Sequence, residues 1–264
     1  MKDRVLVGDA VAGWDNLARI TAYGYPDSAA GKVSELAEFG MDPGLILRSL
    51  ATSVRTGAHL PDATVEQRAC INICTEVCQR LKPDGCTKLG LYINAIRDVL
   101  HENFYGGTIL DFGCGAWVDA SMSLAMGGDY HVQMMDVLEM PLSFAAFQLG
   151  ARGIRHSVTL VLDEATQLDL VADDVVMIVE SSSFEHVPHL REKFEPLMRK
   201  LPAGGLFLTN YTRLDWTREC LDGHQENKDF AARAVEIASD LAYRYEWDPE
   251  QGRGDGWDLW EMKQ

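Results

Sequence analysis

Basic residues are scarce in this sequence. Its 24 lysines and arginines stand against 40 aspartates and glutamates, which gives a formal net charge of -16 at pH 7. Nucleic-acid backbones and anionic membranes bind basic protein surfaces. We therefore expect neither a nucleic acid nor a membrane as a partner. The acidic excess is typical of a solvated surface, and it is also compatible with a cationic ligand.

Long apolar runs are absent as well. No segment approaches the ~18 apolar residues that indicate a membrane span, and residues 1–9 hold no run of the kind found in a signal peptide. We expect a cytoplasmic protein, in which the six cysteines are reduced thiols rather than disulfides.

Three of these cysteines recur at every fourth residue. Cys70, Cys74 and Cys78 lack the CxxxCxxC spacing of the iron–sulfur cluster in radical enzymes. They continue an apolar helical stripe that includes Ile73 and Val77, and a buried free cysteine behaves as a small hydrophobe. We predict that the three cysteines pack in a core, and we expect no metal site.

The chain changes its pattern at residue 106. Residues 1–105 have the spacing of short amphipathic helices, the last of which ends at Asn103. From residue 106 onward, short apolar runs alternate with helical segments, which is typical of a parallel α/β sheet. Strands are expected at residues 108–110, 131–135, 158–162, 174–179 and 206–210. Two aromatic-rich strands, 242–247 and 257–262, then form a predicted hairpin at the sheet edge.

The predicted fold is therefore α/β, a Rossmann-like sheet with a terminal antiparallel hairpin and an N-terminal helical lid. Residues 1–105 would form the lid, which caps the substrate, and residues 106–264 the ligand-binding domain.

A glycine turn follows the first predicted strand of the sheet. In Asp111-Phe112-Gly113-Cys114-Gly115, the glycines let the backbone approach a ligand, and the next helix points its N–H groups at it. Asp136 ends the second strand, where a carboxylate can accept hydrogen bonds from ribose hydroxyls. Asp163 and Glu164 follow the third strand, near the expected place of an adenine amino group. Parallel strands end at one edge of the sheet, so these groups predict a nucleoside-like ligand there.

The motif at residues 109–115 resembles the first motif of the class I S-adenosylmethionine-dependent methyltransferases. Residues 174–187 and 201–205 are similar to the fourth strand, loop, helix and fifth-strand approach of that family. The resemblance implies S-adenosylmethionine as cofactor, with its ribose at Asp136. One departure is Ala116-Trp117, where the family commonly has a third glycine. The residues implied in cofactor binding are Asp111, Gly113, Cys114, Gly115, Asp136, Asp163, Glu164 and Ser181.

Methyl transfer is an in-line displacement at a sulfonium, so the protein chiefly supplies orientation and excludes water. A general base is needed only when the acceptor starts protonated, and the loop after the fourth strand offers Ser182, Glu185 and His186. In the lid, Tyr23 and Tyr25 are expected to reach the site, where aromatic faces attract a sulfonium by cation–π interaction.

The leading hypothesis is a methyltransferase that acts on a small metabolite of specialised metabolism. An alternative is an enzyme of the same fold that cyclises S-adenosylmethionine itself, like an azetidine-2-carboxylate synthase, and releases methylthioadenosine. A third is a non-catalytic protein that binds the cofactor as a sensor. A nicotinamide cofactor is disfavoured, because Val118 stands where the G-x-G-x-x-G pattern needs its third glycine.

Overall fold

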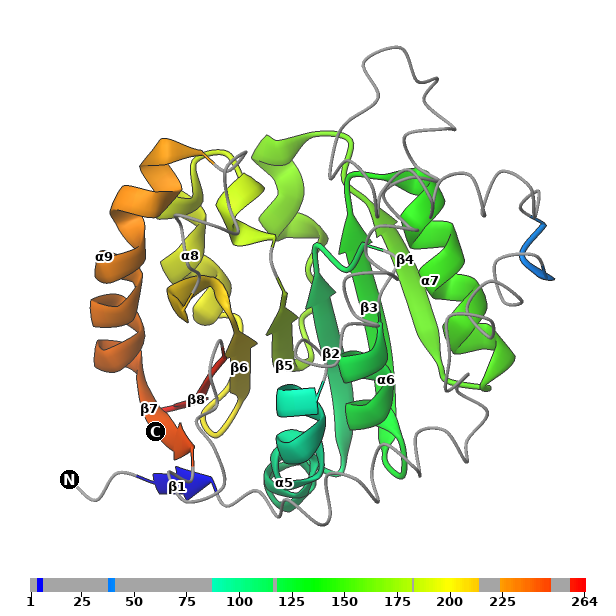
Figure 1. Ribbon diagram of the computed structural model, residues 1–264, viewed down its shortest axis with the longest axis horizontal. Helices are drawn as coiled ribbons and strands as arrows, with labels where there is room; N and C mark the ends of the chain where they lie inside the picture. The colour runs from blue at the N-terminus through cyan, green and yellow to red at the C-terminus, as the bar shows by residue number, and fades with distance from the viewer. Residues whose placement is uncertain are drawn as a thin grey trace.

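The computed structural model describes residues 4–6, 38–40, 87–115, 118–181, 183–213, 224–247 and 257–264. These residues contain one eight-stranded sheet with helices on both faces (Figure 1). Its strands are β1 (Arg4–Leu6), β2 (Gly106–Phe112), β3 (Asp129–Asp136), β4 (His156–Leu160), β5 (Val175–Glu180), β6 (Leu206–Thr209), β7 (Ala242–Trp247) and β8 (Asp258–Met262).

The helices lie on both faces of the sheet, and each face has its own cluster of buried side chains. One cluster unites the sheet with α5 (Thr87–Asn103), α6 (Asp119–Ala125) and α7 (Glu139–Ala151). The other unites it with α8 (Leu190–Met198) and α9 (Gln225–Leu241). Three short 3-10 helices, η1 (Glu164–Leu170), η2 (Phe184–His186) and η3 (Tyr211–Arg213), follow β4, β5 and β6.

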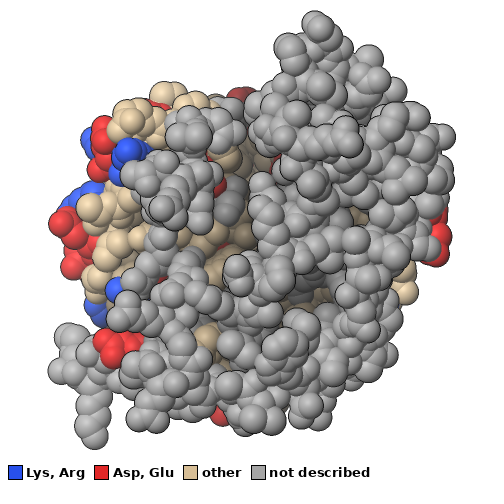
Figure 2. Space-filling view, viewed as in Figure 1, with Lys and Arg blue, Asp and Glu red and all other residues tan. Residues whose placement is uncertain are grey.

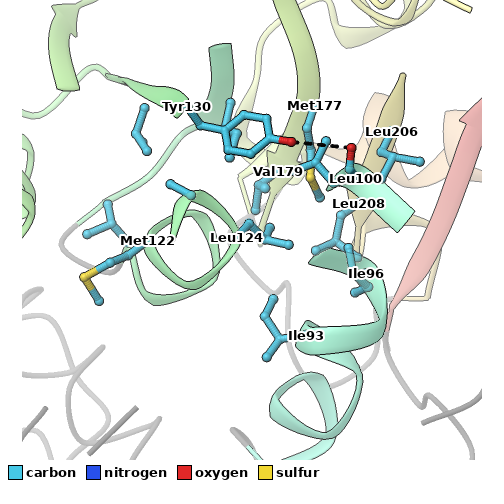
Figure 3. Close-up of a cluster of buried hydrophobic side chains, with 14 of the residues drawn as sticks. Ile93, Ile96, Leu100, Met122, Leu124, Tyr130, Met177, Val179, Leu206 and Leu208 are labelled. Carbon is cyan, nitrogen blue, oxygen red and sulfur yellow. Dashed lines mark hydrogen bonds between the residues drawn. The ribbon is translucent and has the colours of Figure 1, made fainter. Parts of the chain in front are cut away.

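Alternating side chains on the strands explain this layering. On β2, Ile109 belongs to the cluster that includes α5. Leu110 and Phe112 belong to the cluster on the opposite face, with α8 and α9. Successive side chains of a strand point to opposite faces, so a continuous apolar run can serve a sheet that is covered on both sides. Figure 3 shows the first cluster, in which Ile93 and Ile96 of α5 lie near side chains of the central strands.

The strand order is β1-β7-β8-β6-β5-β2-β3-β4. The pairs from β4 across to β6 are parallel, and β8 is antiparallel to both β6 and β7. The structure confirms the predicted Rossmann-like sheet and its terminal antiparallel pair. That pair is not at the edge, however, because β1 adds a parallel strand outside β7. The expectation that the first hundred residues are all helical is wrong at residues 4–6.

Helix α5 packs as part of the sheet assembly although it precedes residue 106. Tyr92, Ile93, Ile96 and Leu100 are buried in the same cluster as the central strands. The division of the chain at residue 106 and the lid itself stay predictions, because most of residues 1–86, including the three spaced cysteines, lie outside the described residues. None of the helices in the described ranges is long and apolar enough to cross a membrane.

Strand β4 begins two residues earlier than the sequence suggests. The apolar run predicted a strand at residues 158–162, but His156–Leu160 pairs with β3 from Val132 to Asp136. Leu162 lies beyond the pairing and is 87% exposed. Hydrophobicity alone misplaced the strand, because backbone pairing with β3 sets its register.

Charged side chains of both signs mix on the outer surface of α9, at the left of Figure 2. One such pair joins Arg233 to Glu236, three residues along the helix, with a nitrogen–oxygen distance of 2.6 Å. An exposed pair of this kind adds little to stability, so this surface is solvated rather than structural.

The glycine turn after β2 depends on a close approach between two segments of chain. Gly113 has φ of +66°, and a Cβ placed on it would lie 2.3 Å from Cβ of Ser183. No side chain fits in that space, and the positive φ is itself unfavourable for any other residue. The turn therefore needs glycine at position 113 for two separate reasons.

We expect Gly113→Ala to lower the free energy of unfolding by clearly more than Gly153→Ala. Gly153 is a matched control, because its φ is +67° and a Cβ there would meet nothing within 4 Å. The control should lose about 1–2 kcal/mol from backbone strain alone. Urea denaturation of both variants measures the difference, and equal losses would show that the contact with Ser183 is not tight.

Candidate functional site

The strands β2, β3, β5 and β6 end at the same edge of the sheet, the upper edge in Figure 1, which we call the carboxyl edge. Pairing sets the ends side by side: Phe112 lies opposite both Met135 and Glu180, and Glu180 lies opposite Thr209. The residues that follow these strands therefore meet in space. This is where parallel sheets bind their ligands.

Backbone hydrogen bonds fasten the glycine turn to the end of β3. The N–H groups of Gly113 and Cys114 donate to the carbonyl oxygen of Met135, at 2.8 and 3.2 Å. The N–H of Gly115 donates to Oδ2 of Asp136 at 2.8 Å. The structure thus brings together the predicted residues Gly113, Cys114, Gly115 and Asp136.

The carboxylate of Asp136 is held in one orientation. Its Oδ1 accepts a hydrogen bond of 2.8 Å from the N–H of Leu138, while Oδ2 accepts from Gly115. The residue is only 9% exposed. Burial raises the pKa of this carboxyl above its usual value, and the backbone hydrogen bonds partly oppose that shift. A carboxylate has about four acceptor positions, so the backbone donors leave part of its acceptor capacity for a ligand.

Asp111, the other acid of the motif, has a different setting. It is 3% exposed, and its Oδ2 accepts a 2.5 Å hydrogen bond from the hydroxyl of Ser121 in α6. The carboxylate therefore links the end of β2 to the helix behind the glycine turn. Its predicted contact with a cofactor stays a prediction.

Apolar side chains stand next to Asp136 at the carboxyl edge. Val137 and Leu138 follow β3 and are 57% and 46% exposed, and Leu162 follows the neighbouring strand β4. These exposed apolar side chains could pack against a flat aromatic ring that lies beside the ribose position. Asp163 accepts a 3.0 Å hydrogen bond from the N–H of Ala165 and so caps η1. The side chain of Glu164 lies outside the described residues.

Glu180, at the end of β5, organises the loop beside the glycine turn. It is fully buried, and its Oε1 accepts hydrogen bonds from the N–H groups of Ser183 and Phe184, at 2.8 and 3.0 Å. Its Oε2 accepts a 2.5 Å hydrogen bond from the hydroxyl of Thr209 in β6. The hydroxyl of Ser183 in turn donates to the carbonyl oxygen of Phe112 at 2.9 Å. One carboxylate thus joins β5, β6 and the turn after β2.

Sequence reasoning did not assign Glu180 to the site. The signal was present, since Glu180 directly follows an apolar strand in the same way as Asp136. The sequence offers no sign that one acid faces a ligand position while the other satisfies buried backbone. Buried N–H groups need acceptors, and only the fold shows which ones they find.

Asn227 in α9 supports the same loop from the other side. Its amide nitrogen donates to the carbonyl oxygens of Phe184, Glu185 and Val187, at 2.8, 3.1 and 2.9 Å. Tyr211, just past β6, donates from its hydroxyl to the carbonyl oxygen of Asn227. Burial, and then the charges of Glu180 and Glu185, raise the pKa of Tyr211 well above its usual range. Tyr211 is fully buried, so it supports the site rather than lining it.

Of the predicted base candidates, Glu185 and His186 are described by the structure, whereas Ser182 is not. Glu185 and His186 both lie in η2, within the connection after β5. Glu185 is 3% exposed, and its Oε1 lies 3.8 Å from Nε2 of His186, whose side chain is 47% exposed. Ser181 is half-buried in the loop between β5 and η2. Predicted residues outside the described part of the chain are Tyr23, Tyr25, Ser182, Ala116 and Trp117.

In the described ranges, no three side chains of His, Cys, Asp or Glu are grouped in a way that would hold a metal ion. What the carboxyl edge offers is a fixed carboxylate, a backbone turn that a ligand can approach closely, and apolar surface. This arrangement suits a nucleoside with a flat base and two free ribose hydroxyls.

No family model and no curated protein matches the sequence. Among solved structures, the CurJ carbon methyltransferase is similar with a TM-score of 0.53 and 11% identity, over 91% of this chain and 72% of that one. A SAM-dependent methyltransferase from Aquifex aeolicus has a TM-score of 0.41 and 18% identity, over 62% and 87% of the two chains. For an rRNA methylase from Streptococcus thermophilus the values are 0.44 and 19%, over 65% and 96%. The strand order, the antiparallel β8 between two parallel strands, and the likeness to the first of these structures show that this chain has the fold of the class I S-adenosylmethionine-dependent methyltransferases.

Proposed function

We propose that this protein is an S-adenosylmethionine-dependent methyltransferase that acts on a small metabolite of specialised metabolism. The observation that carries the proposal is the carboxylate of Asp136, fixed by the N–H groups of Gly115 and Leu138 beside the glycine turn. A carboxylate in this place is preorganised to hold two ribose hydroxyls. Its orientation is set before the ligand arrives, so little side-chain entropy is lost on binding.

The neighbouring residues would hold the rest of the cofactor. Gly113 and Gly115 would let the cofactor lie close to the backbone of the turn, because both have positive φ and no side chain. Val137, Leu138 and Leu162 would pack against the adenine, with Asp163 near its amino group. When bound, the cofactor supplies the methyl group.

His186 is the base we propose for an acceptor that starts protonated. Its side chain is about half exposed, and its Nε2 lies 3.8 Å from Oε1 of the buried Glu185, so the imidazole is accessible to an acceptor and has a polar neighbour. Ser182, Tyr23 and Tyr25 would complete the acceptor side, with the tyrosines excluding water and contacting the sulfonium. The predicted cap, formed by the chain before α5, would suit a small acceptor better than a macromolecule.

The clamp at Glu180 gives the acceptor side its rigidity. The loop that carries Ser181 and Ser182 starts at Glu180 and is fixed again at Ser183, whose N–H donates to the Glu180 carboxylate and whose hydroxyl donates to the carbonyl oxygen of Phe112. Reacting atoms must be aligned within a fraction of an ångström for efficient displacement. Any group that the loop presents to the acceptor is therefore positioned by this carboxylate.

The first test is product analysis with the purified full-length protein. Incubation with S-adenosylmethionine and a metabolite extract should give S-adenosylhomocysteine, detected by mass spectrometry, whereas the cofactor alone should give none. Methylthioadenosine formed without any acceptor would overturn methyl transfer in favour of cyclisation of the cofactor. Tight binding of S-adenosylmethionine without formation of either product would favour a non-catalytic protein that binds the cofactor as a sensor.

We expect Asp136→Ala to weaken cofactor binding by about 1.5–3 kcal/mol, as for hydrogen bonds to a charged group, which corresponds to roughly 10- to 150-fold in Kd. Calorimetry measures the change, with Asp173→Ala as a control that removes an exposed carboxylate before β5. Equal affinity of Asp136→Ala and wild type would place the ribose elsewhere.

Burial raises the pKa of Asp136, so the affinity of the wild-type protein for the cofactor should fall on acidification at a pH above the usual range of aspartate pKa values.

Glu180→Ala should lower stability and cofactor affinity together. It leaves the N–H groups of Ser183 and Phe184 buried without acceptors, at about 1–3 kcal/mol each in the free energy of unfolding. The comparison variant is Thr209→Val, which removes the hydroxyl that donates to the same carboxylate and accepts from the N–H of Tyr211, but leaves the N–H groups of Ser183 and Phe184 with their acceptor. Denaturation and calorimetry on both variants make the comparison, and a Glu180→Ala protein with normal affinity would show that the clamp does not position the site.

A further inference from the structure

A separate hollow lies at the opposite edge of the sheet, where β2, β3 and β4 begin, which we call the amino edge. It measures about 590 Å³ and is lined by the last turns of α5, the turn between α6 and β3, and the loop between α7 and β4. Its volume is in the range of small-molecule sites, which is about 300–1,000 Å³. The strands separate it from the glycine turn, so it is not part of the candidate cofactor site.

Basic side chains dominate the walls of this hollow. The described lining residues include Arg97, His101, Arg152 and Arg155, with Asp98 as the acid. The protein as a whole carries a net charge of -16. A group of basic side chains stands out on so acidic a chain, and it would attract anions locally.

Two of the arginines have structural partners that account for part of this charge. Arg155 donates to the carbonyl oxygen and to Oδ1 of Asp129, at 2.8 and 2.6 Å. Arg152 donates to the carbonyl oxygen of Gln148 at 3.0 Å, which also places its charge at the C-terminal end of α7. Cations stabilise helix C-termini, so Arg152 would be expected there without any ligand.

Arg97 has no such explanation. It is half-buried on α5, more than a turn before the helix ends, and no described carboxylate forms an ion pair with it. Near it, the ring of His101 stacks on Tyr130 with centroids 5.1 Å apart, which gives the hollow a flat wall. Gly153 forms another part of the wall, and the space over its Cα is open to beyond 4 Å.

We propose that this hollow binds a small anion with two or more negative charges, recognised through phosphate groups by Arg97 and Arg152. A guanidinium presents a rigid fork of donors that matches phosphate oxygens in pairs. Arg155 is paired with Asp129 and Arg152 donates to Gln148, whereas Arg97 forms no ion pair with a described carboxylate. The proposal does not depend on the function of the carboxyl edge, because the two sites share no described residue.

The test uses inorganic pyrophosphate as the probe and the full-length protein in low-salt buffer. Calorimetry should detect pyrophosphate binding to wild type, and Arg97→Gln combined with Arg152→Gln should weaken it at least tenfold. Arg233→Gln is the matched control, since it removes one positive charge from the exposed surface of α9. Arg97→Lys, which keeps the charge and loses the fork, should bind with intermediate affinity and guards against a folding defect in the double variant.

Competition experiments separate the hollow from the cofactor site. Pyrophosphate affinity should be the same with and without saturating S-adenosylmethionine, and Asp136→Ala should leave it unchanged. Absence of pyrophosphate binding to wild type would overturn the proposal. So would competition with the cofactor, or equal losses in the Arg97/Arg152 and Arg233 variants.

Discussion

The buried carboxylate of Glu180 is the constraint on which the carboxyl edge depends. Two backbone N–H groups of the loop after β5 and the hydroxyl of Thr209 in β6 donate to it. Full satisfaction is what makes a buried charge tolerable, since its desolvation is otherwise very costly. Through Ser183 the same network contacts Phe112 and sets how closely the glycine turn and the loop approach.

The two faces of the sheet contribute differently to the site. On one face, β3 and the helices α6 and α7 support the glycine turn and Asp136, which form the side expected to hold the cofactor. On the other, α9 supports the loop after β5 through three hydrogen bonds from Asn227. The glycine turn and the loop after β5 are therefore fastened to separate layers, and they come together where Gly113 approaches Ser183 and the hydroxyl of Ser183 donates to Phe112.

Much of the chain after residue 106 was predictable, because its central strands β2, β3, β5 and β6 are largely buried on both faces and read as plain apolar runs. Short runs such as 206–210 allow little freedom in where a strand lies, and β6 follows this one closely. The run near β4 misled because its last apolar residue, Leu162, is exposed. β1 was not foreseen, since a three-residue strand carries no periodic signal and depends on its partner β7.

The sequence by itself determined the order of strands and helices from residue 106 onward, the glycine turn and the place of Asp136 at a strand end, because these depend on local periodicity and on backbone freedom. Only the tertiary structure decided what each buried polar group does. Asp136, Glu180 and Asp111 all follow or end apolar strands, yet one is fixed by the glycine turn, one clamps a loop and one binds Ser121. Their roles differ because hydrogen-bond partners come from segments distant in the chain, which no local pattern encodes.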